Sequence, residues 1–281
     1  MLEWIVLGLI QGLTEWLPVS SEGMVVLAQN WFWPGQVGLR DTIEISLWLH
    51  LGTWLAAVVY FRREIWRLSV SLFRFRGAEV ADRKLIVFLV VSTLISGALG
   101  FGLLELVGIY EEQVLASGRV VMGLVGGLLL VTGWLQLKTR RGIVPDGDFS
   151  RAATQGVRND KTLILSDGVW LGIAQGLAAL PGFSRSGLTV TTLLWRKFDK
   201  EMALRLSFLM SIPIVLAGNI LLNGGMLAGG SELTGAMAGL MAAFVSGWLT
   251  IHWFLIIARR VNFGWFVVGM GVLSLLAAVV G

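Results

Sequence analysis

The chain of 281 residues contains no cysteine, only two histidines and only five prolines. Without cysteine, disulfides, thiolate metal sites and a cysteine nucleophile are excluded, and the redox compartment stays undetermined. Charged residues are also scarce, at 14% of the chain. The sequence has no Walker loop, dinucleotide fingerprint or HExxH motif. The common motifs of soluble nucleotide-binding and zinc enzymes are therefore missing.

Apolar residues dominate the composition of the chain. They make up 56% of the chain, and the mean hydropathy is +0.78, far outside the range of soluble domains. Thirteen tryptophans and 36 glycines suit closely packed helices better than the alternating strands of a membrane barrel. The net charge of +4 lies mostly in two loops, which indicates topology rather than nucleic-acid binding. We therefore predict an all-α polytopic membrane protein.

Six segments approach the roughly 20 apolar residues that a spanning helix needs. They cover residues 43–61, 85–107, 120–137, 203–223, 235–257 and 263–280. Residues 62–84 contain seven Lys or Arg and residues 138–167 contain six, so the positive-inside rule places both loops in the cytoplasm and both termini outside. Because Glu3 replaces a basic start and no small-residue cleavage site follows, we expect no removable signal peptide.

Two further apolar segments, 4–33 and 169–195, are interrupted near their middle by proline and hydroxyl residues. Irregular backbone at membrane depth is tolerated only where it is buried in protein or lines a wet cavity. We therefore predict two re-entrant helical hairpins in addition to the six spans.

The two hairpins are similar to each other. At a shift of 164 residues, seven of the 17 positions from 7 to 23 are identical, among them a glutamine and a serine in apolar surroundings. We interpret this similarity as an inverted-topology repeat within one membrane domain. Its parts are a first repeat at 1–137, a cytoplasmic loop at 138–167 and a second repeat at 168–281.

Each predicted break is followed by residues that can cap a helix. Ser20 or Ser21 can cap the helix after the first break, and Ser184 or Ser186 the helix after the second. The N-terminus of a helix carries unpaired N–H groups and the positive end of the helix dipole, which favour anions and phosphate in particular. We therefore expect an anion site between the hairpins.

Arg185 stands at the second break, where it needs an anionic partner. An unpaired arginine inside a membrane costs roughly 2.5–3.5 kcal/mol on insertion scales. Its planar fork of donors suits a phosphate or a carboxylate. The partner is either a bound anion or Glu15, in a salt bridge that pins the hairpins together without a ligand.

Two stretches carry a resemblance to a known family. QGLTEWLPVSSEGM resembles the (E/Q)-x-x-x-E motif and P-V-S-S turn of the undecaprenyl-diphosphate phosphatase (bacitracin-resistance protein) family, and PGFSRSGLT resembles its P-G-x-S-R-S-x-x-T motif. LHLGTWLAAVVYF, LSFLMSIPIVLAG and ARRVNF extend the resemblance over nearly the whole chain. It implies hydrolysis of an undecaprenyl-type polyprenyl diphosphate to the monophosphate and inorganic phosphate. This reaction recycles the lipid carrier of envelope glycan synthesis.

The resemblance also implies a multi-pass protein of the cell membrane, with an active site that opens to the extracytoplasmic side. A homodimer is a further expectation, and nucleic acid is not an expected partner. The carried-over catalytic residues are Gln11, Glu15, Ser20, Ser21 and Arg185, and the substrate-binding residues are Gly182, Ser184, Arg185, Ser186 and Thr189. Pro181 matches the second motif as well. Ser21 is the expected nucleophile. Glu15 is either its base or a ligand of Mg²⁺ or Ca²⁺, and both roles stay open.

One position departs from the family pattern, which usually has a histidine where this chain has Met24. Glu22 is one candidate to compensate, and the other is His50, where the family more often has glutamine. A simpler interpretation exists for each, since Glu22 can stabilise a helix start and His50 can be a packing residue. The departures suggest a divergent, archaeal branch.

Two other functions fit the same features. A polyprenyl-phosphate transporter or flippase would use the same anion site without hydrolysis, as the inverted repeat and the missing histidine suggest. A structural or assembly subunit would need Arg185 only for stability.

Overall fold

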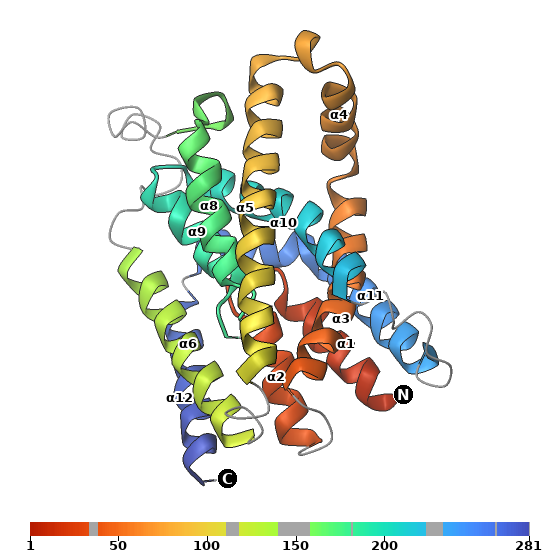
Figure 1. The fold of residues 1–281 in the computed structure, drawn as a ribbon, viewed down its shortest axis with the longest axis vertical. Coiled ribbons are helices and arrows are strands. Elements are labelled where there is room, and N and C mark those ends of the chain that lie inside the picture. Colours follow the sequence, from red (N-terminus) through yellow and green to blue (C-terminus); the bar gives the residue numbers. More distant parts are fainter. Residues whose placement is uncertain are drawn as a thin grey trace.

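A computed structural model describes residues 1–33, 39–110, 118–139, 158–180, 182–222, 233–261 and 263–280. Within these ranges the chain forms eleven α-helices and two short 3-10 helices (Figure 1). They are α1 (Leu2–Thr14), α2 (Ser21–Phe32), α3 (Leu39–Tyr60), α4 (Arg62–Phe73), η1 (Phe75–Gly77), α5 (Val80–Tyr110), α6 (Gly118–Thr139), η4 (Asp160–Thr162), α8 (Leu165–Leu177), α9 (Arg185–Trp195), α10 (Lys200–Leu222), α11 (Leu233–Arg260) and α12 (Gly264–Val280). The predicted all-α class is confirmed.

Five of the described helices are long and apolar enough to cross a membrane. Their apolar stretches are Ile43–Tyr60, Val80–Ile109, Arg119–Lys138, Lys200–Leu221 and Leu233–Ile257, which overlap the first five predicted spans. The predicted end of the fourth span, Asn223, lies outside the described residues. The sixth predicted span forms α12, an apolar helix of 17 residues that is shorter than the other five. The protein is therefore a multi-pass membrane protein.

Both interrupted segments consist of two short helices joined by an irregular turn. In Figure 1 the open end of the α1–α2 pair lies toward the bottom of the view and that of the α8–α9 pair toward the top. Ser20 caps α2 by accepting a hydrogen bond from the Gly23 N–H, and Ser184 caps α9 by accepting one from the Gly187 N–H, each at 3.0 Å. The predicted caps are thus Ser20 and Ser184.

The first helix of each pair packs against a long helix from the other half of the chain, α1 against α11 and α8 against α5. Glycine permits both approaches. A Cβ atom at Gly8 would lie 2.2 Å from the carbonyl oxygen of Gly239, and one at Gly172 would lie 2.7 Å from Cβ of Ile95. Close packing through small residues is typical of helix contacts in membranes. Gly8 and Gly172 are paired at the 164-residue shift, so one packing constraint explains both.

Asp167 fixes the open end of the second pair. Its buried carboxylate accepts hydrogen bonds of 2.9 and 2.7 Å from Arg158 and a further one from Arg196, which directly follows α9. Burial alone would raise the pKa of Asp167, but hydrogen bonds, led by those from Arg158, lower it. The start of α8 and the end of α9 are therefore tied to one ionised side chain.

We expect Gly8→Val to destabilise the protein, because the side chain has no room between α1 and Gly239. Overpacking typically costs about 1–3 kcal/mol, so the thermal unfolding midpoint in detergent should fall by roughly 2–4 °C per kcal/mol. Gly102→Val is the matched control, since a Cβ atom at Gly102 meets nothing within 4 Å. Equal midpoints for the two variants would contradict the close contact of α1 with α11.

Candidate active site

The turns of the two hairpins line a common cavity of about 210 Å³. Helices α3, α5 and α10 complete its wall, mostly with apolar side chains such as Leu47, Phe101 and Ile214. The polar residues that line it are Glu15, Ser20, Ser21, Glu22, His50, Ser96, Gln175, Ser184, Arg185 and Ser186. The cavity therefore has a polar end at the hairpin turns and an apolar wall along the long helices.

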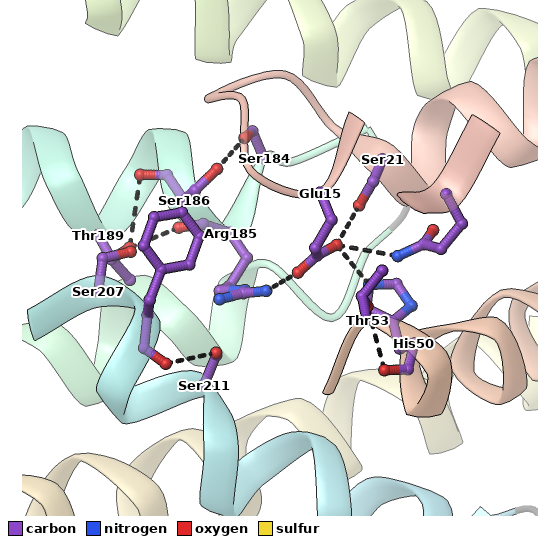
Figure 2. Close-up of polar contacts among 12 residues, drawn as sticks. Glu15, Ser21, His50, Thr53, Ser184, Arg185, Ser186, Thr189, Ser207 and Ser211 are labelled. Atoms are coloured by element: carbon purple, nitrogen blue, oxygen red, sulfur yellow. Dashed lines mark hydrogen bonds and ion pairs between the residues drawn. The ribbon is translucent and has the colours of Figure 1, made fainter. Parts of the chain in front are cut away.

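Glu15 is the centre of the polar end, as Figure 2 shows. Its Oε1 accepts a hydrogen bond from Arg185 Nη2, which closes an ion pair between the two hairpins. Its Oε2 accepts hydrogen bonds from Ser21 Oγ at 2.7 Å and from Gln11 Nε2 at 2.9 Å. His50 Nε2 lies 3.3 Å from the same oxygen. The structure thus brings four predicted site residues together around the carboxylate of a fifth.

The ion pair leaves part of the guanidinium available. Nη1 of Arg185 is buried and has no hydrogen-bond partner among the described residues. A buried donor without an acceptor is costly, so this N–H is expected to find one. The side chain lines the cavity beside Ser21 and is 17% exposed. The salt bridge with Glu15 therefore does not use all of the binding capacity of Arg185.

His50 is held in one orientation by its own helix. Its Nδ1 lies 2.7 Å from the carbonyl oxygen of Ser46, one turn earlier. A carbonyl can only accept, so Nδ1 carries a proton. Nε2 then faces the Glu15 carboxylate, another acceptor, and the contact requires a second proton between the imidazole and the carboxylate. The side chain is therefore a proton donor toward Glu15.

The position of the missing family histidine is apolar. Met24 is buried and packs with Val19 and Val125, and it does not line the cavity. Glu22 does line the cavity, and among the described residues no side chain forms a hydrogen bond or ion pair with its carboxylate. Of the two predicted compensating residues, only His50 contacts Glu15.

The remaining predicted residues hold the turns in place. Ser186 Oγ donates to the Leu17 carbonyl at 3.0 Å, and Ser20 Oγ lies 3.5 Å from the Phe183 carbonyl, so each turn contacts the other. Gly182 has a φ of 104°, which favours glycine, and it turns the chain before the cap of α9. Pro181 lies outside the described residues.

Thr189 lies behind the second turn and does not line the cavity. Its hydroxyl donates to the Arg185 carbonyl at 2.7 Å and lies 2.6 Å from the hydroxyl of Ser207 on α10 (Figure 2). It therefore supports the first turn of α9, on which Arg185 stands. Sequence reasoning missed Ser207 and Ser46, although Ser46 precedes His50 by four residues, the spacing of helix neighbours.

A divalent cation needs several oxygen ligands in one place. No three His, Cys, Asp or Glu side chains in the described ranges are grouped so that they could hold a metal. Both Glu15 oxygens already accept hydrogen bonds, whereas the Glu22 carboxylate lines the cavity and Gln11 Oε1 is a buried acceptor without a partner. Mg²⁺ often binds one or two carboxylates plus substrate phosphates. Of Glu22 and Gln11, only Glu22 lines the cavity, so Glu22 is the one that fits a cation held mainly by substrate.

The sequence matches the family described as bacitracin resistance protein BacA over residues 4–276. The chain belongs to this family. The BacA match includes both hairpins and every helix that lines the cavity.

Several curated relatives of this BacA chain bear the name undecaprenyl-diphosphatase. The protein of Methanococcoides burtonii is 43% identical over 98% of this chain and 97% of its own length. Those of Methanothrix thermoacetophila and Haloarcula marismortui are 36% and 37% identical, over 98% and 92% of this chain and 95% and 90% of their own lengths. The predicted family resemblance is therefore confirmed, and it includes archaeal relatives.

We expect Glu15 and Arg185 to be strongly coupled in stability. Removing one partner of a buried ion pair leaves an uncompensated charge and costs about 3–5 kcal/mol, while removing both costs less than the sum. Unfolding in detergent of Glu15→Gln, Arg185→Gln and the double variant measures this coupling. Glu22→Gln is the control, because the Glu22 carboxylate forms no ion pair with any residue that the structure describes. Additive effects of the two single changes would show that the pair is not formed.

Proposed function

We propose that the protein hydrolyses a polyprenyl diphosphate of the undecaprenyl type to the monophosphate and inorganic phosphate. The relatives named undecaprenyl-diphosphatase support this reaction class. The single observation that carries the proposal is the Ser21 hydroxyl, hydrogen-bonded to Glu15, in the same cavity as the unpartnered Nη1 of Arg185. A nucleophile with a base and a donor for phosphate oxygens are the two parts that phosphoryl transfer needs.

In this mechanism Ser21 is the nucleophile. Its Oγ attacks the terminal phosphorus, its proton passes to Glu15 Oε2, and the bond from that phosphorus to the bridging oxygen breaks. Arg185 Nη1 and the N–H groups at the start of α9 stabilise the charge on the phosphoryl oxygens. Water then cleaves the phosphoserine, which releases inorganic phosphate and restores the hydroxyl.

His50 supplies the acid–base group that Met24 lacks. Its second proton, directed at Glu15, can be passed through that carboxylate to the departing monophosphate or taken back from the attacking water. The carboxylate then serves as base toward Ser21 in one step and as the relay to His50 in the next. Gln11 holds the carboxylate in place through its 2.9 Å hydrogen bond.

A divalent cation, Mg²⁺ or Ca²⁺, would be held by the Glu22 carboxylate together with phosphate oxygens. When bound, it would neutralise part of the charge of the diphosphate. We assign the cation to Glu22 and leave Glu15 to proton transfer, because Glu15 already accepts four donors.

We also propose the finer membrane arrangement of six spans and two re-entrant hairpins in an inverted repeat, with the cavity open to the extracytoplasmic side. The matched serine caps, the paired glycines and the reciprocal packing of α1 on α11 and α8 on α5 support it. A carrier that moves polyprenyl phosphate without hydrolysis needs the anion site but no hydroxyl paired with a carboxylate. The homodimer stays a prediction.

Phosphate release from undecaprenyl diphosphate by the purified protein tests the proposal. We expect Ser21→Ala to lower the rate by at least about 10³-fold, because the nucleophile is lost. Ser274→Ala is the control, since this buried serine on α12 bonds to the Met122 carbonyl and lies outside the cavity lining. A wild-type protein that binds the lipid but releases no phosphate with Mg²⁺ or Ca²⁺ present would favour transport instead.

The role of His50 can be tested by substitution, with the only other histidine of the chain, His252, as the control. We expect His50→Gln to lower kcat by about 10²–10⁴-fold and to remove one limb of the pH–rate profile, because proton transfer is lost. His252→Gln should change neither quantity, since His252 is exposed on α11. A His50→Gln enzyme with the wild-type pH profile would assign His50 to packing.

A further inference from the structure

A second cavity of about 390 Å³ lies next to the candidate active site along α5 and α10. Its lining is almost entirely apolar. The residues are Ile65, Leu68, Ser69 and Leu72 from α4, Ile86, Leu89, Val90, Thr93 and Leu94 from α5, and Leu209, Ile212 and Pro213 from α10. The lining of the active-site cavity begins on the same two helices directly after that of the second cavity, at Ser96 on α5 and at Ile214 on α10.

The two cavities use the same faces of both helices. On α5 the lining residues recur at helical spacing from one cavity into the other, at positions 86, 90, 93, 97, 100 and 104. On α10 they recur at positions 209, 213, 217 and 221. Residues three or four apart lie on one side of a helix. The cavities are therefore two parts of one seam between α5 and α10, which we call the α5–α10 seam.

Glycine keeps side-chain bulk low on the active-site side of this seam. At Gly97 the nearest atom to a Cβ position is Ile214 Cδ1, at 3.5 Å, and at Gly218 a Cβ would meet nothing within 4 Å. The α3–α11 pair, which would be the counterpart in an inverted repeat, is closed instead. There a Cβ at Gly52 would lie 2.4 Å from the Leu240 carbonyl oxygen, and Trp48 donates to the Ala236 carbonyl.

The seam has the length of a lipid chain that crosses the bilayer. Positions 86 to 104 of α5 cover roughly 27 Å at about 1.5 Å per residue, against a hydrocarbon core of about 30 Å. Positions 96 to 104 of α5 line the active-site cavity, and the lining of the second cavity, at positions 86 to 94, is almost entirely apolar. An anionic headgroup at Arg185 would thus place its hydrocarbon chain directly in the seam.

We propose that the α5–α10 seam binds the polyprenyl chain of the substrate, from the headgroup at Arg185, past Gly97 and Ile214, into the apolar cavity beside α4. This inference rests on the proposed function for the headgroup. It adds a chain-length-dependent subsite, since a short prenyl chain would end before the second cavity and a long one would enter it.

Gly97→Leu tests the seam, because a leucine there would occupy the space beside Ile214, where the lining of the first cavity meets that of the second. Phosphate release is measured with undecaprenyl diphosphate and with a C15 prenyl diphosphate. We expect the KM of the long substrate to rise about tenfold, the loss expected when roughly two methylene groups lose burial, and that of the C15 substrate to stay within about twofold. Gly102→Leu, on the same helix and facing open space, should behave as wild type for both.

An equal change for both substrates, or no change for either, would overturn the proposal. So would a Gly102→Leu enzyme with the same defect as Gly97→Leu. A wild-type protein that hydrolyses neither substrate would contradict the proposed function. Because no KM values could then be compared, the seam is also tested by a binding measurement that does not depend on hydrolysis.

Photo-crosslinking in proteoliposomes supplies that measurement. The probe is a long-chain polyprenyl phosphate with a photoreactive group at the far end of its chain. Labelling of α4 and of α5 near Leu94, reduced in Gly97→Leu and unchanged in Gly102→Leu, supports the seam without any hydrolysis. Labelling of α6 and α12 instead, or equal loss of label on addition of plain phospholipid, would overturn it.

Discussion

The ion pair between Glu15 and Arg185 is the interaction on which the rest of the site depends. It joins two hairpin turns that are 170 residues apart in sequence, in surroundings too apolar to hold either charge alone. Neither charge is fully satisfied by the other, because Nη1 of Arg185 has no partner in the described part of the chain. A pair that holds the turns together and leaves one guanidinium donor without an acceptor, on a residue that lines the cavity, suits a site for an anionic headgroup.

The pair can form because both hairpins are held in place by close packing against helices of the other half. The glycines of α1 and α8 allow each to lie against a helix of the other half, and the serine caps start α2 and α9 at equivalent points. Asp167 then ties the second hairpin at its open end. Backbone sterics therefore place the turns, and electrostatics only completes their contact.

Much of this could be predicted from the sequence. Apolar length gave five of the helices that are long enough to span, and the capping preferences of serine gave both hairpin turns. The family motifs predicted that Gln11, Glu15, Ser21 and Arg185 belong to one site. The tertiary contacts could not be predicted. These are the place of Thr189 behind the turn, the contact of His50 with Glu15, and the two cavities along α5 and α10 where α3 and α11 pack closely. Hydropathy carries no information about which face of a helix meets which neighbour.

In the proposed mechanism, the contact between His50 and Glu15 compensates for the missing family histidine. Met24 and His50 lie on different helices, α2 and α3, but the carboxylate of Glu15 is within reach of the second. Proton transfer requires only a group near the acceptor, with its other nitrogen held, and Ser46 meets that need through its carbonyl. When a phosphate engages Arg185, the guanidinium shares its charge between two anions and holds Glu15 less strongly. The carboxylate then becomes a better acceptor for the Ser21 proton at the moment when the hydroxyl must attack, so substrate binding itself would prepare the base.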